Sequence, residues 1–265
     1  MNTRVWRSFV AIGDSFTEGM CDDDGAPLGE FRGWADRLAE ALAHRTARAG
    51  QEFRYANLAV RGRLLDNIAG PQLDTALALQ PELVSIVGGG NDILRPRSDV
   101  DALLAQLEAA VVRARESGAD VLMSTAADPV RSPLIRLTRG RAAIFTAGIW
   151  SIARKHECYL INLWSLPALQ SWQAWADDRI HLTTAGHRAV TAAALSALAL
   201  EVSDADEAVV AKDVPMSFVE RLQWNARWGR EYVRPWIRRR LARRSSGDGR
   251  QAKRPELDAW PPGRD

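Results

Sequence analysis

The sequence predicts an α/β fold, in which helices cover both faces of a parallel sheet of about five strands and a helical, basic C-terminal extension follows. Short apolar runs typical of buried strands alternate with amphipathic stretches of helical length. This alternation is typical of a parallel sheet. The runs assigned to strands are residues 9–12, 53–58, 83–87, 121–123 and 159–163. The expected helices are residues 33–47, 64–79 (interrupted or kinked at Gly70-Pro71), 100–117, 141–155 and 183–200.

Composition divides the 265 residues into four segments. Residues 1–201 form the main α/β domain, and residues 202–215 are a polar, mostly acidic linker. Residues 216–244 form a helical arm rich in Trp and Arg, with a break expected near Pro235. Residues 245–265 contain little apolar content, so we expect a disordered tail.

Hydrophobic residues make up 46% of the chain and charged residues 26%, which is typical of a soluble globular protein. No stretch approaches the roughly 18 apolar residues that a membrane span requires. The N-terminal apolar run is too short for a signal peptide and has no cleavage site. We therefore expect a cytoplasmic protein.

A serine directly follows the first expected strand, in the triplet Gly13-Asp14-Ser15. A hydroxyl at this point is exposed at the carboxyl edge of the sheet, where such folds place their active sites. The backbone N–H of Ser15 can help to stabilise an oxyanion. Alone the triplet is a weak signal, since a turn that caps a helix looks the same.

A histidine late in the chain can serve as the general base that a weakly nucleophilic serine needs. It lies in Asp178-Arg179-Ile180-His181, just before the last expected helix of the main domain. A carboxylate three residues upstream, Asp178, can fix the tautomer of the ring and stabilise the imidazolium. The alternative is a surface turn that caps the following helix.

Two further loops follow expected strands and can supply oxyanion donors. Gly89-Gly90-Asn91-Asp92 comes after the third strand, and the Asn91 amide can donate to a developing negative charge. Gly62, after the second strand, can offer its backbone N–H. Each loop alone is also compatible with an ordinary turn that ends a strand.

Taken in order, these four sites give the sequence a resemblance to the SGNH hydrolases, also called GDSL esterases/lipases. The resemblance covers about residues 5–200 and implies a three-layer α/β/α, flavodoxin-like fold. It implies a serine hydrolase that cleaves a carboxylic ester of a small or short-acyl substrate through an acyl-enzyme. Ser15 would be the nucleophile, His181 its base and Asp178 the residue that orients His181.

The same resemblance implies an oxyanion hole formed by the Ser15 and Gly62 amides and the Asn91 side chain, with no metal and no cofactor. Asp14 and Asp92 would support the loops around the site. The walls of the substrate pocket are expected in residues 22–25 and 128–140. Neither Cys21 nor Cys158 lies in a pattern with metal-ligand spacing.

The basic arm allows several interpretations. Residues 221–254 contain twelve Lys or Arg and two acidic residues, although the whole chain has a net charge of only +2. The arm can lie on the acidic main domain, bind an anionic membrane surface or bind a protein partner. Nucleic acid is an unlikely partner because no recognised nucleic-acid module surrounds the arm. A peripheral membrane location and a binding protein with incidental hydrolysis therefore stay as alternatives.

Overall fold

The structure, a computed structural model, describes most of the chain. The described residues are 4–24, 26, 30–132, 135–202, 211, 213, 215–235, 238, 242 and 245–260. The expected linker therefore lies mostly outside the described residues, as do Trp236 and residues 261–265.

Six strands form one sheet in the order β5-β4-β3-β1-β2-β6. The strands are β1 (Ser8–Gly13), β2 (Arg54–Asn57), β3 (Leu83–Val87), β4 (Asp120–Ser124), β5 (Tyr159–Ile161) and β6 (Arg254–Ala259). Strands β1 to β5 are parallel to their neighbours, and their order is that of a flavodoxin-like fold. Strand β6 is antiparallel to β2. The predicted fold class is confirmed, with one more strand than expected.

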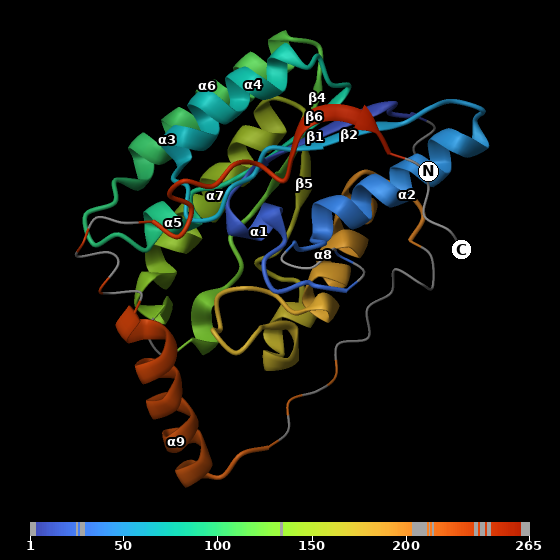
Figure 1. The fold of residues 1–265 in the computed structure, drawn as a ribbon. Helices are drawn as coiled ribbons and strands as arrows, with labels where there is room; N and C mark the ends of the chain where they lie inside the picture. The colour runs from blue at the N-terminus through green and yellow to red at the C-terminus, as the bar shows by residue number, and fades with distance from the viewer. Residues whose placement is uncertain are drawn as a thin grey trace.

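Helices cover both faces of the sheet (Figure 1). One face carries α2 (Trp34–Arg48) and α8 (Thr184–Ala197), and the other carries helical segments that lie between β2 and β5 in the sequence. The helical segments on that second face are α3 (Leu65–Asn67), η1 (Ile68–Gln72), α4 (Leu73–Ala78), α6 (Val100–Glu116) and α7 (Arg139–Lys155). Alternation along β1 explains the two layers, because Phe9 and Ala11 pack toward α2 while Val10 and Ile12 pack toward the other face.

The expected helix over residues 64–79 is bent at the predicted place. Pro71 lies inside η1, a π-helical turn between α3 and α4. Proline cannot donate a backbone hydrogen bond, so the regular ladder is interrupted there. The irregular turn buries Gln72, whose side chain accepts from Gly13 N (2.8 Å) and donates to Gly13 O (3.0 Å). The kink thereby holds the end of β1, next to the candidate nucleophile.

The expectation of disorder over residues 245–265 is corrected for residues 245–260. Strand β6 pairs with β2, and Trp260 packs edge-on against Tyr55 with ring centroids 5.4 Å apart. The Lys253 ammonium donates to Glu18 O (2.7 Å), Phe31 O (2.8 Å) and the Asp36 carboxylate (2.6 Å). Backbone pairing and one largely buried cation thus stabilise a segment with few apolar residues.

The arm begins as a helix, α9 (Phe218–Trp228), and continues as a π-helical turn, η6 (Gly229–Val233). Ser217 caps α9, and its hydroxyl and the Glu220 carboxylate form a capping box. The backbone is helical at Arg234 and Pro235, and residues 236 and 237 lie outside the described residues, so the break expected near Pro235 stays a prediction. Figure 1 shows α9 projecting away from the sheet, at the lower left of the view.

Buried His187 gives the fold a predicted pH dependence. Its Nδ1 accepts from Trp34 N (3.3 Å), and its Nε2 lies 3.2 Å from Met20 O, which suits a neutral ring. Burial lowers the pKa of His187 to about 4, although the Met20 carbonyl opposes this shift. In the unfolded chain His187 has its ordinary pKa of 6.5, so as the pH falls it takes up a proton there before it does so in the folded protein. Stability from neutral His187 is full above pH 6.5 and decreases toward pH 4.

We expect His187→Gln to remove this dependence. Between pH 7 and pH 4, the wild type should lose about 3 kcal/mol of unfolding free energy relative to the variant. Urea denaturation of both proteins at several pH values measures the difference, in which contributions from other groups cancel. Equal pH profiles for the two proteins would contradict the assignment.

Candidate active site

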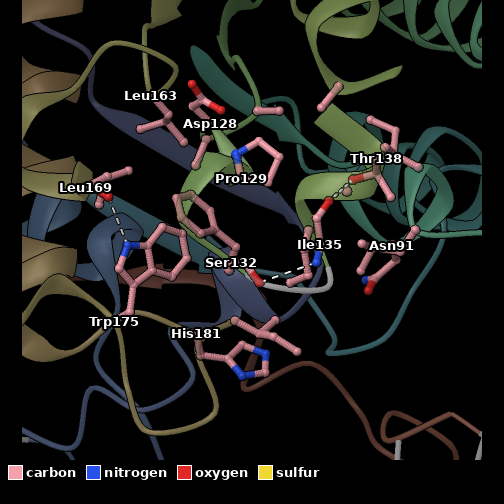
Figure 2. Close-up of a pocket in the computed structure, with 18 of the residues that line it drawn as sticks. Asn91, Asp128, Pro129, Ser132, Ile135, Thr138, Leu163, Leu169, Trp175 and His181 are labelled. Carbon is pink, nitrogen blue, oxygen red and sulfur yellow. Dashed lines mark hydrogen bonds between the residues drawn. The ribbon is translucent and has the colours of Figure 1, made fainter. Parts of the chain in front are cut away.

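A pocket opens where β1, β3 and β4 end and the loop before α8 begins. Ser15 lines it together with many apolar side chains. Asn91 and His181 also line it (Figure 2). Residues 128, 129, 131, 132, 135 and 138 provide one wall, as the sequence predicted. Residues 22–24 do not line this pocket, which corrects the other predicted wall. Asp22 is instead buried in an ion pair with Arg37.

The strand-to-helix turn after β1 presents Ser15. Asp14 caps the short helix α1 (Ser15–Glu18) by accepting from Phe16 N (3.0 Å). A Cβ at Gly13 would lie 2.6 Å from Val87 O, so the tight passage beside β3 requires glycine. Ser15 therefore lies at the first position of a helix and at the mouth of the pocket.

Ser15, His181 and Asp178 form a continuous hydrogen-bonded chain. Ser15 Oγ lies 2.9 Å from His181 Nε2, and His181 Nδ1 lies 2.5 Å from Asp178 Oδ2. The other carboxylate oxygen of Asp178 accepts from Ile180 N and His181 N, each at 3.0 Å. The structure thus brings together residues that are 166 positions apart in the sequence.

The surroundings of Asp178 keep it ionised. Burial raises the pKa of Asp178, but hydrogen bonds from the His181 ring and from the His181 and Ile180 amides outweigh burial. The pKa consequently lies below its usual value. An ionised carboxylate in this position can stabilise the imidazolium that forms when His181 accepts a proton.

The three candidate oxyanion donors differ in their availability. No described residue accepts a hydrogen bond from the Ser15 or Gly62 amide. The Asn91 amide is engaged, because its Nδ2 donates to Asp14 Oδ2 and Arg63 O, each at 3.0 Å. An oxyanion would have to compete with these two acceptors. Gly62 does not line the pocket, whereas Ser15 and Asn91 do.

Gly62 has a tail residue packed against it. It adopts a left-handed backbone (φ 72°), and a Cβ at this position would lie 2.3 Å from Ser245 Oγ. The Ser245 hydroxyl donates a hydrogen bond to the Gly62 carbonyl (3.3 Å). The C-terminal segment therefore covers one side of the loop that carries Gly62. Sequence reasoning missed this contact because the tail contains no apolar pattern.

Asp14 and Asp92 tie the site loops to one another. Burial raises the pKa of Asp14 to about 6, against the hydrogen bond from Phe16 N. Asp92 Oδ2 accepts from Leu65 N (3.0 Å), which joins the loop after β3 to α3. Burial also raises the pKa of Asp92 above its usual value. Neither carboxylate contacts Ser15 or His181 by a hydrogen bond, so their geometry is that of supporting residues.

One group of side chains in the described chain has the spacing of metal ligands: Cys21, Asp178 and His181, with candidate atoms within 4.8 Å of one another. Asp178 and His181 already bond to each other, so a metal ion would have to break that contact. Burial and the Asp178 charge raise the pKa of the Cys21 thiol to about 11. A neutral thiol is a poor ligand at neutral pH.

The comparisons with known proteins agree with this fold. The GDSL-like lipase/acylhydrolase family matches residues 11–189. An α/β hydrolase from the metagenome of Lake Arreo, Spain, is 23% identical, with a TM-score of 0.62, covering 74% of this chain and 97% of its own. The acetylxylan esterase Axe2 of Geobacillus stearothermophilus is 19% identical, with a TM-score of 0.60 and coverages of 75% and 97%.

A third similar structure is TesA, at 23% identity and a TM-score of 0.58, with coverages of 72% and 97%. No curated protein matches the sequence. The fold and the family match define an enzyme of the carboxylic ester hydrolase class. The chain belongs to the GDSL-like lipase/acylhydrolase family.

The arm contains no membrane-spanning segment in its described part. No helix among the residues that the structure describes is long and apolar enough to cross a bilayer.

Proposed function

We propose that the protein hydrolyses a small carboxylic ester through an acyl-enzyme, with Ser15 as nucleophile, His181 as general base and Asp178 as the residue that orients His181. The observation that carries the proposal is the hydrogen-bonded chain from Ser15 Oγ through His181 to Asp178. Both ring nitrogens of His181 are engaged in it, one toward the nucleophile and one toward a carboxylate. This is the arrangement that activates a serine hydroxyl.

In the first half-reaction, Ser15 Oγ attacks the ester carbonyl and its proton passes to His181 Nε2. The carbonyl oxygen becomes an oxyanion, for which the Ser15 and Gly62 amides and Asn91 are the proposed donors. The intermediate collapses, the alcohol leaves with the proton from His181, and the acyl group stays on Ser15. Water then gives a proton to His181 and attacks the acyl carbonyl. The acyl–Oγ bond breaks as His181 returns the proton to Ser15 Oγ, and the acid is released.

The pocket supports a substrate with an apolar part. Beyond the polar residues around Ser15, its walls are mainly aliphatic and aromatic. These side chains include Val87, Ile93, Ile135, Phe145, Leu163, Leu169, Trp172 and Trp175. A wall of this kind favours an acyl group with several methylenes over acetate alone. Burial of each methylene contributes about 0.8 kcal/mol, roughly a fourfold change in rate constant.

A p-nitrophenyl ester series from acetate to decanoate tests the reaction and the acyl pocket. We expect kcat/KM to rise about fourfold per methylene from acetate until the pocket is full. Narrowing one wall with Ile135→Trp should shorten the preferred chain while acetate hydrolysis persists. A flat profile across the series would contradict an acyl pocket. Hydrolysis that persists in Ser15→Ala would contradict the mechanism itself.

The exposed face of α9 favours a second function, docking on an anionic membrane surface. Phe218, Val219 and Leu222 are 59–72% exposed, and Arg221 and Arg230 are exposed on the same arm. Apolar side chains beside arginines suit the interface of an anionic bilayer.

Co-sedimentation with phosphatidylglycerol vesicles, compared with phosphatidylcholine vesicles, tests docking. Binding should be selective for the anionic vesicles, weaken with salt and decrease in a Phe218→Ser/Leu222→Ser variant. Point variants are preferable to removal of the arm, because the arm contacts the loop that carries Asp178. Absence of binding at low salt would exclude membrane docking and leave the esterase proposal intact.

A further inference from the structure

Arg179 lies between Asp178 and His181 in sequence but is held by the arm. It is 2% exposed and has a left-handed backbone with φ 58°, which is costly for a residue with a side chain. This conformation directs the Ile180 and His181 amides toward Asp178 Oδ1, where each donates at 3.0 Å. The turn that aims Asp178 at His181 therefore depends on an unfavourable backbone conformation.

Three indole rings and one amide surround the Arg179 side chain; we call them the Arg179 cage. The guanidinium carbon lies 3.3 Å from the ring centroid of Trp224, 4.9 Å from that of Trp228 and 5.5 Å from that of Trp172. The guanidinium also donates to Asn225 Oδ1 (2.7 Å) and to Trp224 O (3.1 Å). Three of the four cage residues belong to α9.

The cage replaces an ion pair. No carboxylate of the described residues lies within ion-pair distance of Arg179, and burial lowers the pKa of its guanidinium to about 10. Cation–π contacts with three rings offset part of the cost of a buried charge. A carboxylate paired with Arg179 would place a second negative charge beside Asp178. The neutral indole rings anchor the arginine without adding that charge.

A second contact joins α9 to the same loop. Trp228, which is 7% exposed, donates from its indole Nε1 to the Asp178 carbonyl at 2.7 Å. The loop is thus held at two points, the Asp178 carbonyl and the guanidinium of the left-handed residue Arg179. Both anchors lie on a helix outside the residues that match the family.

We propose that α9 is a positioning element of the active site, which acts through the Arg179 cage to keep Asp178 directed at His181. The inference rests on the proposed function, since it needs Asp178 and His181 to act together. The arm then contributes to catalysis without touching substrate. Loss of the cage should relax the turn, lengthen the contact between Asp178 and His181 and lower kcat while KM stays unchanged.

Two variants perturb the Arg179 cage in different ways: one alters a ring, and the other removes the side chain that the rings surround. Trp228→Phe deletes the indole N–H and weakens the stacking, while Arg179→Gly keeps a residue that adopts positive φ readily but has no side chain to anchor. We expect kcat for a p-nitrophenyl ester to fall about 10- to 100-fold in each, because small misplacements of catalytic groups have effects of this size. Gln223→Ala, an exposed change on the same helix, is the matched control and should keep wild-type kcat.

A double-mutant cycle separates positioning from a purely structural role. In an Asp178→Asn background, Trp228→Phe should lower kcat little further, because the Arg179 cage acts through Asp178. Multiplicative losses in the double variant would overturn the proposal, as would a rise in KM with unchanged kcat. If Ser15→Ala is inactive but both cage variants keep full kcat, only this inference fails. Activity in Ser15→Ala would instead refute the proposed function.

Discussion

Replacing His181 by alanine should lower kcat for a p-nitrophenyl ester by about 10⁴-fold or more, with little change in KM. Removal of the serine or the base of such a triad typically costs about as much as removal of the whole triad. His181 Nε2 is 2.9 Å from Ser15 Oγ, and no other described histidine contacts Ser15. Initial rates of hydrolysis of the preferred ester over a range of concentrations give kcat and KM for both proteins.

The effects of removing Ser15 and His181 on kcat should not add, and this supplies the control. Ser15→Ala and the Ser15→Ala/His181→Ala double variant should be about as slow as His181→Ala alone. A fluorophosphonate probe should label the wild type, label His181→Ala far more slowly and leave Ser15→Ala unlabelled. If His181→Ala keeps more than roughly a tenth of wild-type kcat, another group accepts the proton and the assignment is wrong.

Lys253→Met should destabilise the fold by about 3–5 kcal/mol, the usual cost when one partner of a buried ion pair is removed. The Asp36 side chain is 5% exposed and the Lys253 side chain 12%. Burial raises the pKa of Asp36, and the Lys253 ammonium opposes this shift. Without the ammonium, the Asp36 carboxylate stays buried and loses the cation that balances its charge. Urea denaturation at pH 7 measures the loss.

Two further variants make the comparison sharp. Lys155→Met removes an exposed ion pair with Glu108 and should cost no more than about 1 kcal/mol. Adding Asp36→Asn to Lys253→Met should recover part of the lost stability, because the buried charge is then gone. A loss for Lys253→Met no larger than that for Lys155→Met would contradict the role assigned to the tail.

The sequence predicts the main domain well because its signals are local. The run 9–12 is apolar on both faces and ends at glycine, which is typical of a buried parallel strand and directs attention to Ser15. The spacing of Asp178 and His181 likewise fits one turn. Their approach to Ser15 and the burial of the apolar pocket walls are consequences of the same strand order.

The contributions of the C-terminal segment could not be predicted in this way. Residues 254–259 alternate polar and apolar side chains, but Leu257 is the one large apolar side chain among them, which is too weak a pattern to predict a strand. Their pairing with β2 depends on backbone groups and on Lys253, which have no sequence signature. The spacing of Trp224 and Trp228 is that of one helix face, but it does not say what that face contacts. Its partner, Arg179, lies 45 residues before Trp224 and is buried by rings that only the folded arm supplies.

Strand β6 also affects how the sheet meets other chains. Without it, β2 would offer a row of free backbone groups, the kind of edge on which proteins aggregate. The strand that takes this position contains Arg254, Pro255, Glu256 and Asp258, all of which disfavour pairing with a further strand. At the opposite edge, β5 has only three residues. Both borders of the sheet are therefore poor templates for edge-to-edge association between copies of the enzyme.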